Sequence, residues 1–341
     1  MKKVLALALA LALCLGVAIP ALAAEQTPAA QSVFTDVAAD RWSYDVIRYC
    51  HEQGLVKGTG EDRFDPTGTL TVGQALVLAA RLHRLTHPAA EPVSGESTLR
   101  FLAEDGSEIA SYTWDDLPSY NAVGQLYVAL SDTPGDPNLP ETCAMELSVA
   151  GCVPVRSFQG KRESHTPPDG VMSQGLRGTG YRFEDENAAT LFSRWCSLGS
   201  SSAKAYKDAW WYSDALYLNY AAGIDVDGGI VYRLLRDDPA ERPDSYDPTT
   251  GFDRDPASRA LFAWLLDQVI DEELEAINDV SAVPDVAPDF EDAAAILRLY
   301  GAGIITGVDR EGNFRGAQEL TREQAAAMLA RVLKSELRQR I

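Results

Sequence analysis

Two arginines follow a hydroxyl side chain at points where the sequence predicts that a helix begins, Thr321-Arg322 and Ser258-Arg259. If Thr321 and Ser258 are the capping residues, the backbone N–H groups of the first helical turn lack partners, and the helix dipole adds partial positive charge there. A guanidinium beside such a turn forms a compact site for a carboxylate or a phosphate. The pattern therefore predicts up to two anion-binding sites.

The alternative is that these residues only cap helices. Thr321 and Gln324 match the pattern in which two side chains, three residues apart, bond to each other's backbone N–H groups. Capping explains these two residues, but it explains the arginines less well, because a cation at a helix start opposes the dipole. A third start, Thr71-Val72-Gly73-Gln74, keeps the capping residues and lacks the arginine, so no anion site is expected there.

Each of these starts is preceded by another predicted helix that ends in a glycine. Apolar side chains at helical spacing lie between Trp42 and Gln53, and Gly54 follows as the residue that turns left-handed. Gly223 and Gly303 end two similar segments. The three copies are assigned to residues 33–87, 203–270 and 278–338, and a polar insertion interrupts the second. Helix pairs of this kind cannot bury their apolar faces alone, so the copies are expected to pack around a shared axis.

The first and third copies also share landmarks in the same order. Residues 34–37 read Phe-Thr-Asp-Val, residues 284–286 read Pro-Asp-Val, and Asp36 is as far from Gly54 as Asp285 is from Gly303. This pattern resembles the S-layer homology family, whose repeat carries Asp-Val, Trp, Gly-Ile-x-x-Gly, Phe-x-Pro and Thr-Arg-Ala-Glu. The family usually has three tandem repeats. The resemblance implies a mainly α fold, with three helical repeats around a pseudo-three-fold axis.

The resemblance also implies a ligand. The family binds pyruvylated secondary wall polysaccharide, whose pyruvate ketal offers a carboxylate, and the arginine of its Thr-Arg-Ala-Glu motif contributes to the pocket. Arg322 and Arg259 would then hold the carboxylate, while Trp42 and Trp211 would offer an apolar platform to a sugar ring. The expected partner is this polysaccharide or a peptidoglycan-linked glycan. The remaining residues of the expected site are Thr321, Glu323, Ser258, Asp36 and Asp285.

The first residues have the order of a secretory signal peptide, which is assigned to residues 1–24. Lys2 and Lys3 precede an apolar run from Val4 to Ile19, and the alanines around residue 23 offer a small-residue cleavage site. The run is shorter than the ~20 apolar residues that a membrane span needs. No later segment is apolar enough to cross a bilayer. The chain is therefore expected to be secreted and held at the cell surface, in the cell wall or S-layer.

Composition narrows the partners and cofactors. A formal net charge of −20 argues against nucleic acid and anionic lipid. Export permits disulfides, so Cys143 and Cys152 are expected to pair, while Cys50 and Cys196 are expected as buried thiols. The chain has four histidines and no Cys-x-x-C motif. A zinc site built from His and Cys is therefore not predicted, and no metal or other cofactor is expected.

Residues 88–202 separate the first two copies and are expected to form a small α+β module. Thr98 to Trp114 alternates like a hairpin. Ser173 lacks the glycines of a hydrolase nucleophile, and the acidic residues 184–186 fit a helix start. No catalytic set is found, so the chain is expected not to be an enzyme. Two alternatives stay open: an enzyme that acts on wall glycan through this module, or a structural envelope protein whose degenerate repeats bind other proteins.

Overall fold

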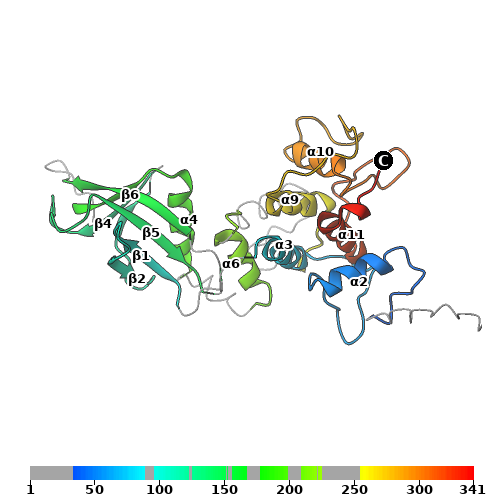
Figure 1. Cartoon of the computed structure of the whole chain (residues 1–341), viewed down its shortest axis with the longest axis horizontal. Coiled ribbons are helices and arrows are strands. Elements are labelled where there is room, and N and C mark those ends of the chain that lie inside the picture. Colours follow the sequence, from blue (N-terminus) through cyan, green and yellow to red (C-terminus); the bar gives the residue numbers. More distant parts are fainter. Residues whose placement is uncertain are drawn as a thin grey trace, which may run out of the picture.

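The computed structural model describes residues 34–88, 96–122, 125–150, 152, 156–166, 177–198, 209–220, 222–224 and 254–341. The expected signal peptide and Ser173 lie outside these residues. The described chain has two parts, with a sheet and one helix at one end and a group of helices at the other (Figure 1). Within the described residues, no helix is both long enough and apolar enough to cross a membrane.

The prediction of a mainly α fold is wrong, because the inserted module is built on a seven-stranded antiparallel sheet. The strand order is β2-β1-β5-β6-β7-β4-β3. One helix, α4 (Glu186–Ser197), packs on this sheet, and the indole N–H of its Trp195 donates to the Ser148 carbonyl at 3.2 Å. The strands are β1 (Thr98–Leu102), β2 (Glu108–Tyr112), β3 (Ser119–Asn121), β4 (Leu126–Ser131), β5 (Thr142–Ser148), β6 (Arg156–His165) and β7 (Gly178–Phe183).

Three of these strands, β3, β6 and β7, were not predicted, and the last two are polar or rich in glycine. Phe158 is the one large apolar side chain on β6, and β7 begins Gly-Thr-Gly. The close approach of the strands requires these glycines. A Cβ at Gly160 would lie 2.6 Å from the Phe183 ring, and one at Gly180 would lie 1.9 Å from the Val128 carbonyl oxygen. Packing therefore selects glycine where strand propensity disfavours it.

The helical part contains one pair of described helices from each expected copy. Gly54, Gly223 and Gly303, which follow the first helix of each pair, have φ of 72, 73 and 69°. The left-handed turns predicted at these glycines are thus confirmed. The helices are α2 (Tyr44–Glu52) and α3 (Val72–Thr86), α6 (Tyr212–Tyr220) and α9 (Arg259–Val269), and α10 (Ala293–Gly301) and α11 (Arg322–Leu333), with a 3-10 turn η2 (Ser335–Leu337) at the end.

The second helix of each pair is capped as the sequence predicts. Thr71 and Thr321 each accept a hydrogen bond from the backbone N–H three residues later, and Gln74 and Gln324 return the bond, so both capping boxes are present. Ser258 caps α9 by accepting from the Leu261 N–H at 3.1 Å. The three starts are therefore all capped by local contacts.

A closed ring of backbone hydrogen bonds joins the three segments that precede these starts. The Leu70 N–H donates to the Leu320 carbonyl (2.8 Å), the Leu320 N–H to the Ala257 carbonyl (2.9 Å), and the Ala257 N–H to the Leu70 carbonyl (2.8 Å). A second set of three bonds runs from the N–H groups that open α3, α9 and α11 to the neighbouring segment. The three helix starts thus meet around one point, each bonded to the next.

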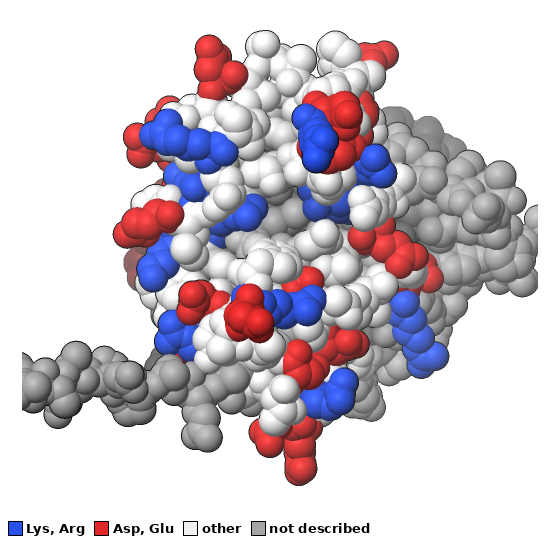
Figure 2. All heavy atoms as spheres, turned by 90° about the vertical axis from the view of Figure 1, so that its right-hand side faces the viewer, with Lys and Arg blue, Asp and Glu red and all other residues white. Residues whose placement is uncertain are grey.

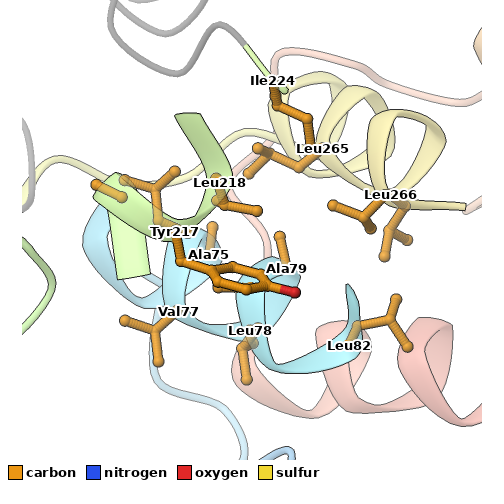
Figure 3. Close-up of a cluster of buried hydrophobic side chains, with 14 of the residues drawn as sticks. Ala75, Val77, Leu78, Ala79, Leu82, Tyr217, Leu218, Ile224, Leu265 and Leu266 are labelled. Carbon is orange, nitrogen blue, oxygen red and sulfur yellow. The ribbon is translucent and has the colours of Figure 1, made fainter. Parts of the chain in front are cut away.

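Apolar packing, together with an ion pair, holds the first and second helix pairs together. Arg84 of α3 pairs with Asp214 of α6, and its guanidinium carbon lies 3.9 Å from the centroid of the Tyr217 ring. Each leucine buried in such an interface contributes about 1.5–3 kcal/mol. Figure 3 shows the buried side chains between α3, α6 and α9, which include Ala75, Val77, Leu78, Ala79, Leu82, Tyr217, Leu218, Ile224, Leu265 and Leu266.

The predicted disulfide between Cys143 and Cys152 is not formed in the structure, where both are buried free thiols. Cys143 lies in β5, which runs extended to Ser148 before the chain turns. Five extended residues advance the chain by about 16 Å, whereas a disulfide needs its Cα atoms within about 7 Å. Cys50 is buried as predicted, and Cys196 is half-buried.

Candidate functional site

Arg322 opens α11 and reaches the loop of the first copy. Its Nε donates to the Phe64 carbonyl at 2.7 Å and its Nη2 donates to the Lys57 carbonyl at 3.0 Å. The guanidinium carbon lies 4.8 Å from the centroid of the Phe64 ring. Burial lowers the pKa of Arg322 below its ordinary value. Among the residues that the structure describes, no carboxylate lies at salt-bridge distance from this cation, although Arg41, Arg48, Arg63 and Arg84 each have such a partner.

Arg259 opens α9 and repeats this arrangement against the loop of the third copy. Its Nε donates to the Phe314 carbonyl at 2.9 Å, and its Nη2 donates to the Thr306 carbonyl at 3.2 Å. The side chain lies over the Phe314 ring. Arg259 is 3% exposed, and burial lowers its pKa. The two arginines thus use equivalent atoms on equivalent loops, and in each of them these bonds occupy two of the five N–H groups that a guanidinium offers.

A groove adjoins each of these arginines. The first groove, of about 300 Å³, is lined by residues of the first copy together with Trp210 and Arg322. The second groove, of about 210 Å³, is lined by residues of the third copy together with Trp42 and Arg259. The linings match position by position: Lys57, Gly58, Gln74, Val77, Leu78 and Arg81 in the first groove correspond to Thr306, Gly307, Gln324, Ala327, Met328 and Arg331 in the second.

Each groove contains a second arginine that the sequence analysis missed. Arg81 on α3 donates to the Leu55 carbonyl at 2.8 Å, and Arg331 on α11 donates to the Ile304 carbonyl at 3.1 Å. Burial lowers the pKa of both. The signal was present in the sequence, because both arginines follow their capping threonine at the same separation. Each groove therefore has two half-buried or buried cations.

The exposed tryptophans of the grooves are Trp42 and Trp210, with 60% and 58% of their surface exposed. Trp211, to which the sequence analysis assigned the platform, is 6% exposed and packs in the core. The hydrogen bonds that open α2 and α6 explain the difference. The Tyr44 N–H donates to the Arg41 carbonyl, and the Tyr212 N–H donates to the Ala209 carbonyl in the same way. Trp42 therefore corresponds to Trp210. The segment from Tyr212 to Gly223 is one residue longer than the segment from Tyr44 to Gly54. A count back from the glycine therefore selects Trp211 in place of Trp210.

The third interface lies where α3 begins, and it has none of the groove side chains. Val72 stands in place of the arginine and is fully buried. On α9, Leu261 replaces the glutamine of the grooves, and Gln268 replaces the second arginine. The Ile296 N–H donates to the Asp292 carbonyl as the Ile47 N–H donates to the Ser43 carbonyl, so Asp292 corresponds to Ser43. Glu291, one residue earlier, therefore occupies the position of Trp42. The described part of this interface therefore lacks both the cations and the tryptophan.

Asp36 and Asp285 hold the loops that the arginines contact. Asp36 accepts the backbone N–H groups of Phe64 and Asp65, both at 2.8 Å. Asp285 accepts those of Phe314 and Arg315, both at 2.6 Å. Burial acts to raise the pKa of Asp36, but the bonds from the backbone N–H groups outweigh it and lower the pKa below 3.8. Both carboxylates therefore fix the Phe64 and Phe314 carbonyls in place.

Glu323 joins the third copy to the first. It is 6% exposed and forms a two-point pair with Arg41, at 2.7 and 2.8 Å. The Ser43 hydroxyl donates to the same carboxylate at 2.5 Å. These contacts join α11 to the segment before α2, so Glu323 acts as a clamp between copies. Thr321 and Ser258 likewise use their hydroxyls as helix caps.

Acidic and basic side chains are unevenly distributed over the surface of the helical end. Figure 2 shows that acidic and basic side chains alternate over this face, and that Lys and Arg side chains lie along its central hollow. The hollow therefore differs in sign from the net charge of −20. An anionic ligand would meet positive charge only at short range.

Comparisons with known proteins agree with the repeat pattern. A family model described as the S-layer homology domain matches residues 33–76 and 283–326. The S-layer protein sap of Bacillus anthracis is 38% identical over 84 residues, which are 25% of this chain and 10% of that protein. The chain thus covers a small part of that relative. No solved structure matches the chain. The prediction of S-layer homology domains is confirmed at these two places, in the first and third copies.

Proposed function

We propose that the chain attaches non-covalently to the cell wall by binding a secondary wall polysaccharide, or a peptidoglycan-linked glycan, in its two grooves. The observation that carries the proposal is the repetition of one side-chain set. Two arginines, a glutamine and an exposed tryptophan occur in both grooves, and the third interface lacks the arginines and the tryptophan. Folding alone would not require the set, because α3 begins equally well without an arginine.

The side chains suit a sugar that carries a carboxylate. The guanidinium groups of Arg322 and Arg81, or of Arg259 and Arg331, would bind the carboxylate of a pyruvate ketal. The exposed Trp210 or Trp42 face would cover a sugar ring. A glutamine amide in each groove can both donate to and accept from ring hydroxyls. The large negative net charge then makes binding depend on these few local cations.

The remaining residues of the expected site support the grooves from behind. Asp36 and Asp285 fix the loops, Thr321 and Ser258 cap the helices, and Glu323 clamps two copies together. In this proposal they shape the groove without touching the glycan. Arg322 and Arg259 do both, because each holds loop carbonyls with one edge and can bind a carboxylate with the other.

The chain is proposed to be a non-enzymatic surface protein that displays the inserted module. The acidic residues 184–186 lie at the start of α4, where Asp185 accepts the Asn187 N–H at 2.8 Å. This supports the interpretation of that cluster as a helix start. His165 lies at the end of β6, with its ring 6.1 Å from that of Tyr127.

The test is co-sedimentation of the protein with purified walls that have, or lack, their pyruvylated polymer. Trp42→Ala combined with Trp210→Ala should weaken binding to complete walls by about 1–3 kcal/mol, because both platforms are lost. Both side chains are exposed, so thermal melts should not change. Tyr120→Ala, an exposed aromatic on the inserted module, is the matched control and should bind like the parent. Equal binding to stripped and complete walls would refute the pyruvylated polymer as the ligand.

A further inference from the structure

Two histidines and an aspartate meet where α3 ends. His83 and His87 lie one turn apart on α3, and Asp271 follows the end of α9. One ligand atom from each of the three side chains lies within 4.8 Å of the other two. The His87 Nε2 is 3.1 Å from the nearer carboxylate oxygen of Asp271. In the described part of the chain, this is the one grouping of metal-ligating side chains of that kind.

Hydrogen bonds fix which ring nitrogens face the cluster. The His87 Nδ1 lies 3.1 Å from the His83 carbonyl and 2.9 Å from the Thr86 hydroxyl, so it faces α3, and a hydrogen bond to the carbonyl requires the proton on Nδ1. The Nε2 of a neutral ring then points a lone pair at the Asp271 carboxylate. The His83 Nδ1 is 2.8 Å from the Tyr217 hydroxyl, which leaves its own Nε2 for another partner. A proton on the His87 Nε2 would make its contact with Asp271 a hydrogen bond, and a metal ion bound to the deprotonated nitrogen would take the place of that proton.

This arrangement is common around metal-bound histidines, whose second nitrogen usually bonds to a carbonyl or another polar group of the protein. Tyr217 is buried between α3, α6 and α9, so it holds the His83 ring firmly (Figure 3). The two imidazole rings are 4.1 Å apart and nearly parallel, at 11°. Parallel rings do not aim their lone pairs at one point. A shared ion therefore requires the His87 ring to turn out of this stack and to exchange its Nδ1 contacts with α3 for the ion, and its side chain, 35% exposed, has room to do so.

We propose that His83, His87 and Asp271 bind a divalent transition-metal ion, with Zn²⁺ the best match to two imidazoles and one carboxylate. Three protein ligands leave one tetrahedral position for water. The ion would join the end of α3, in the first copy, to the chain after α9, in the second. It would thus tie together two copies that the inserted module separates. The sequence alone did not indicate this site, because Asp271 is distant in the chain from the two histidines and no cysteine accompanies them.

The experiment is calorimetric titration of the full, metal-free protein with Zn²⁺, with thermal melts at each Zn²⁺ concentration. The parent should bind one ion saturably and melt at a higher temperature when loaded. His87→Gln and Asp271→Asn, both at the surface, should each raise the Kd for Zn²⁺ by at least about tenfold, since even indirect partners of metal ligands change affinity by that factor. His83→Gln should do the same, but its burial makes it the weaker test.

The matched controls are Glu272→Gln, beside Asp271, and His165→Gln, on the inserted module. Both should bind Zn²⁺ like the parent. Titration with Co²⁺ gives an independent readout, because a tetrahedral site produces visible absorption bands that His87→Gln should remove. Absence of saturable binding by the parent would overturn the proposal. Undiminished binding in both His87→Gln and Asp271→Asn would also overturn it, since the ion would then be held elsewhere.

Discussion

The first groove and the third interface follow the same folding rules but differ in what surrounds the helix start. At Thr321 and at Thr71 a capping box opens the helix, and the backbone N–H that follows bonds to the neighbouring segment. Around Thr321, however, Arg322 and Trp210 join the lining, whereas Val72 is buried beside Thr71. The difference indicates that capping builds the repeat, and that the arginines and tryptophans are added for another purpose.

We expect the largest loss of wall binding when both Arg322 and Arg259 are removed. Arg322→Ala with Arg259→Ala should abolish wall binding, because each groove loses a charge-assisted contact of about 1.5–3 kcal/mol. The melting temperature should also fall, since these arginines hold the carbonyls of Phe64 and Phe314. Co-sedimentation with walls, at a temperature where the variant is folded, measures the first effect. A folded double variant that binds like the parent would reduce both starts to plain caps.

Removing the clamp between copies tests stability without removing a groove cation. Glu323→Ala should destabilise the protein by about 2–3 kcal/mol, which is less than for a fully buried pair because Arg41 is partly exposed. Denaturant unfolding measures this loss. Gly73, at the equivalent position of α3, offers the comparison, because Gly73→Ala removes no such pair. If Glu323→Ala unfolds at the parent's denaturant midpoint, the Glu323–Arg41 pair does not contribute to holding the copies together.

Acid should loosen the first groove through Asp36. Its pKa is below 3.8 in the folded protein, so the folded state binds fewer protons there than the unfolded state. Its contribution is therefore complete above about pH 4 and is lost as the pH falls through the folded pKa. Asp36→Asn should flatten the dependence of melting temperature on pH below 4, relative to the parent. An unchanged slope in that range would show that the loop does not depend on this carboxylate.

The third interface should give the smallest effect on binding. Val72→Ala should leave wall binding unchanged, although the lost core contact should lower stability by about 1–2 kcal/mol. Parallel co-sedimentation and denaturant unfolding separate the two quantities. Weaker binding by a folded Val72→Ala protein would mean that the third interface also contacts the ligand, and that two grooves are not the whole site.

Features set by local rules were predictable, and features set by distant contacts were not. Capping boxes and left-handed glycines depend on a few neighbouring residues, so Thr321, Gly54 and Gly303 were placed correctly. The role of Trp210 depends on one extra residue before Gly223, which no count from a single landmark reveals. Arg81 and Arg331 look like ordinary surface residues of a helix until a neighbouring copy covers them.

The inserted module marks a second limit of the same kind. Its outer hairpin alternates clearly enough to be predicted, but β6 and β7 carry glycines that only the Phe183 ring, at Gly160, and the Val128 carbonyl, at Gly180, explain. Local preference argues against a strand there, and packing against the neighbouring strands overrides it. The sheet therefore grew larger in the structure than any single segment of the sequence indicated.

The ring of backbone hydrogen bonds formed by Leu70, Ala257 and Leu320 also determines when the helical part can assemble. Its members are spread over most of the chain, so the ring cannot close until the last copy has been synthesised. The inserted module, complete in sequence much earlier, can fold first, because domains generally fold as they emerge. Closing contacts between such distant segments is slow. A nascent chain would thus present a finished sheet while its grooves are still unformed, which delays any capture by ligand to the final step of folding.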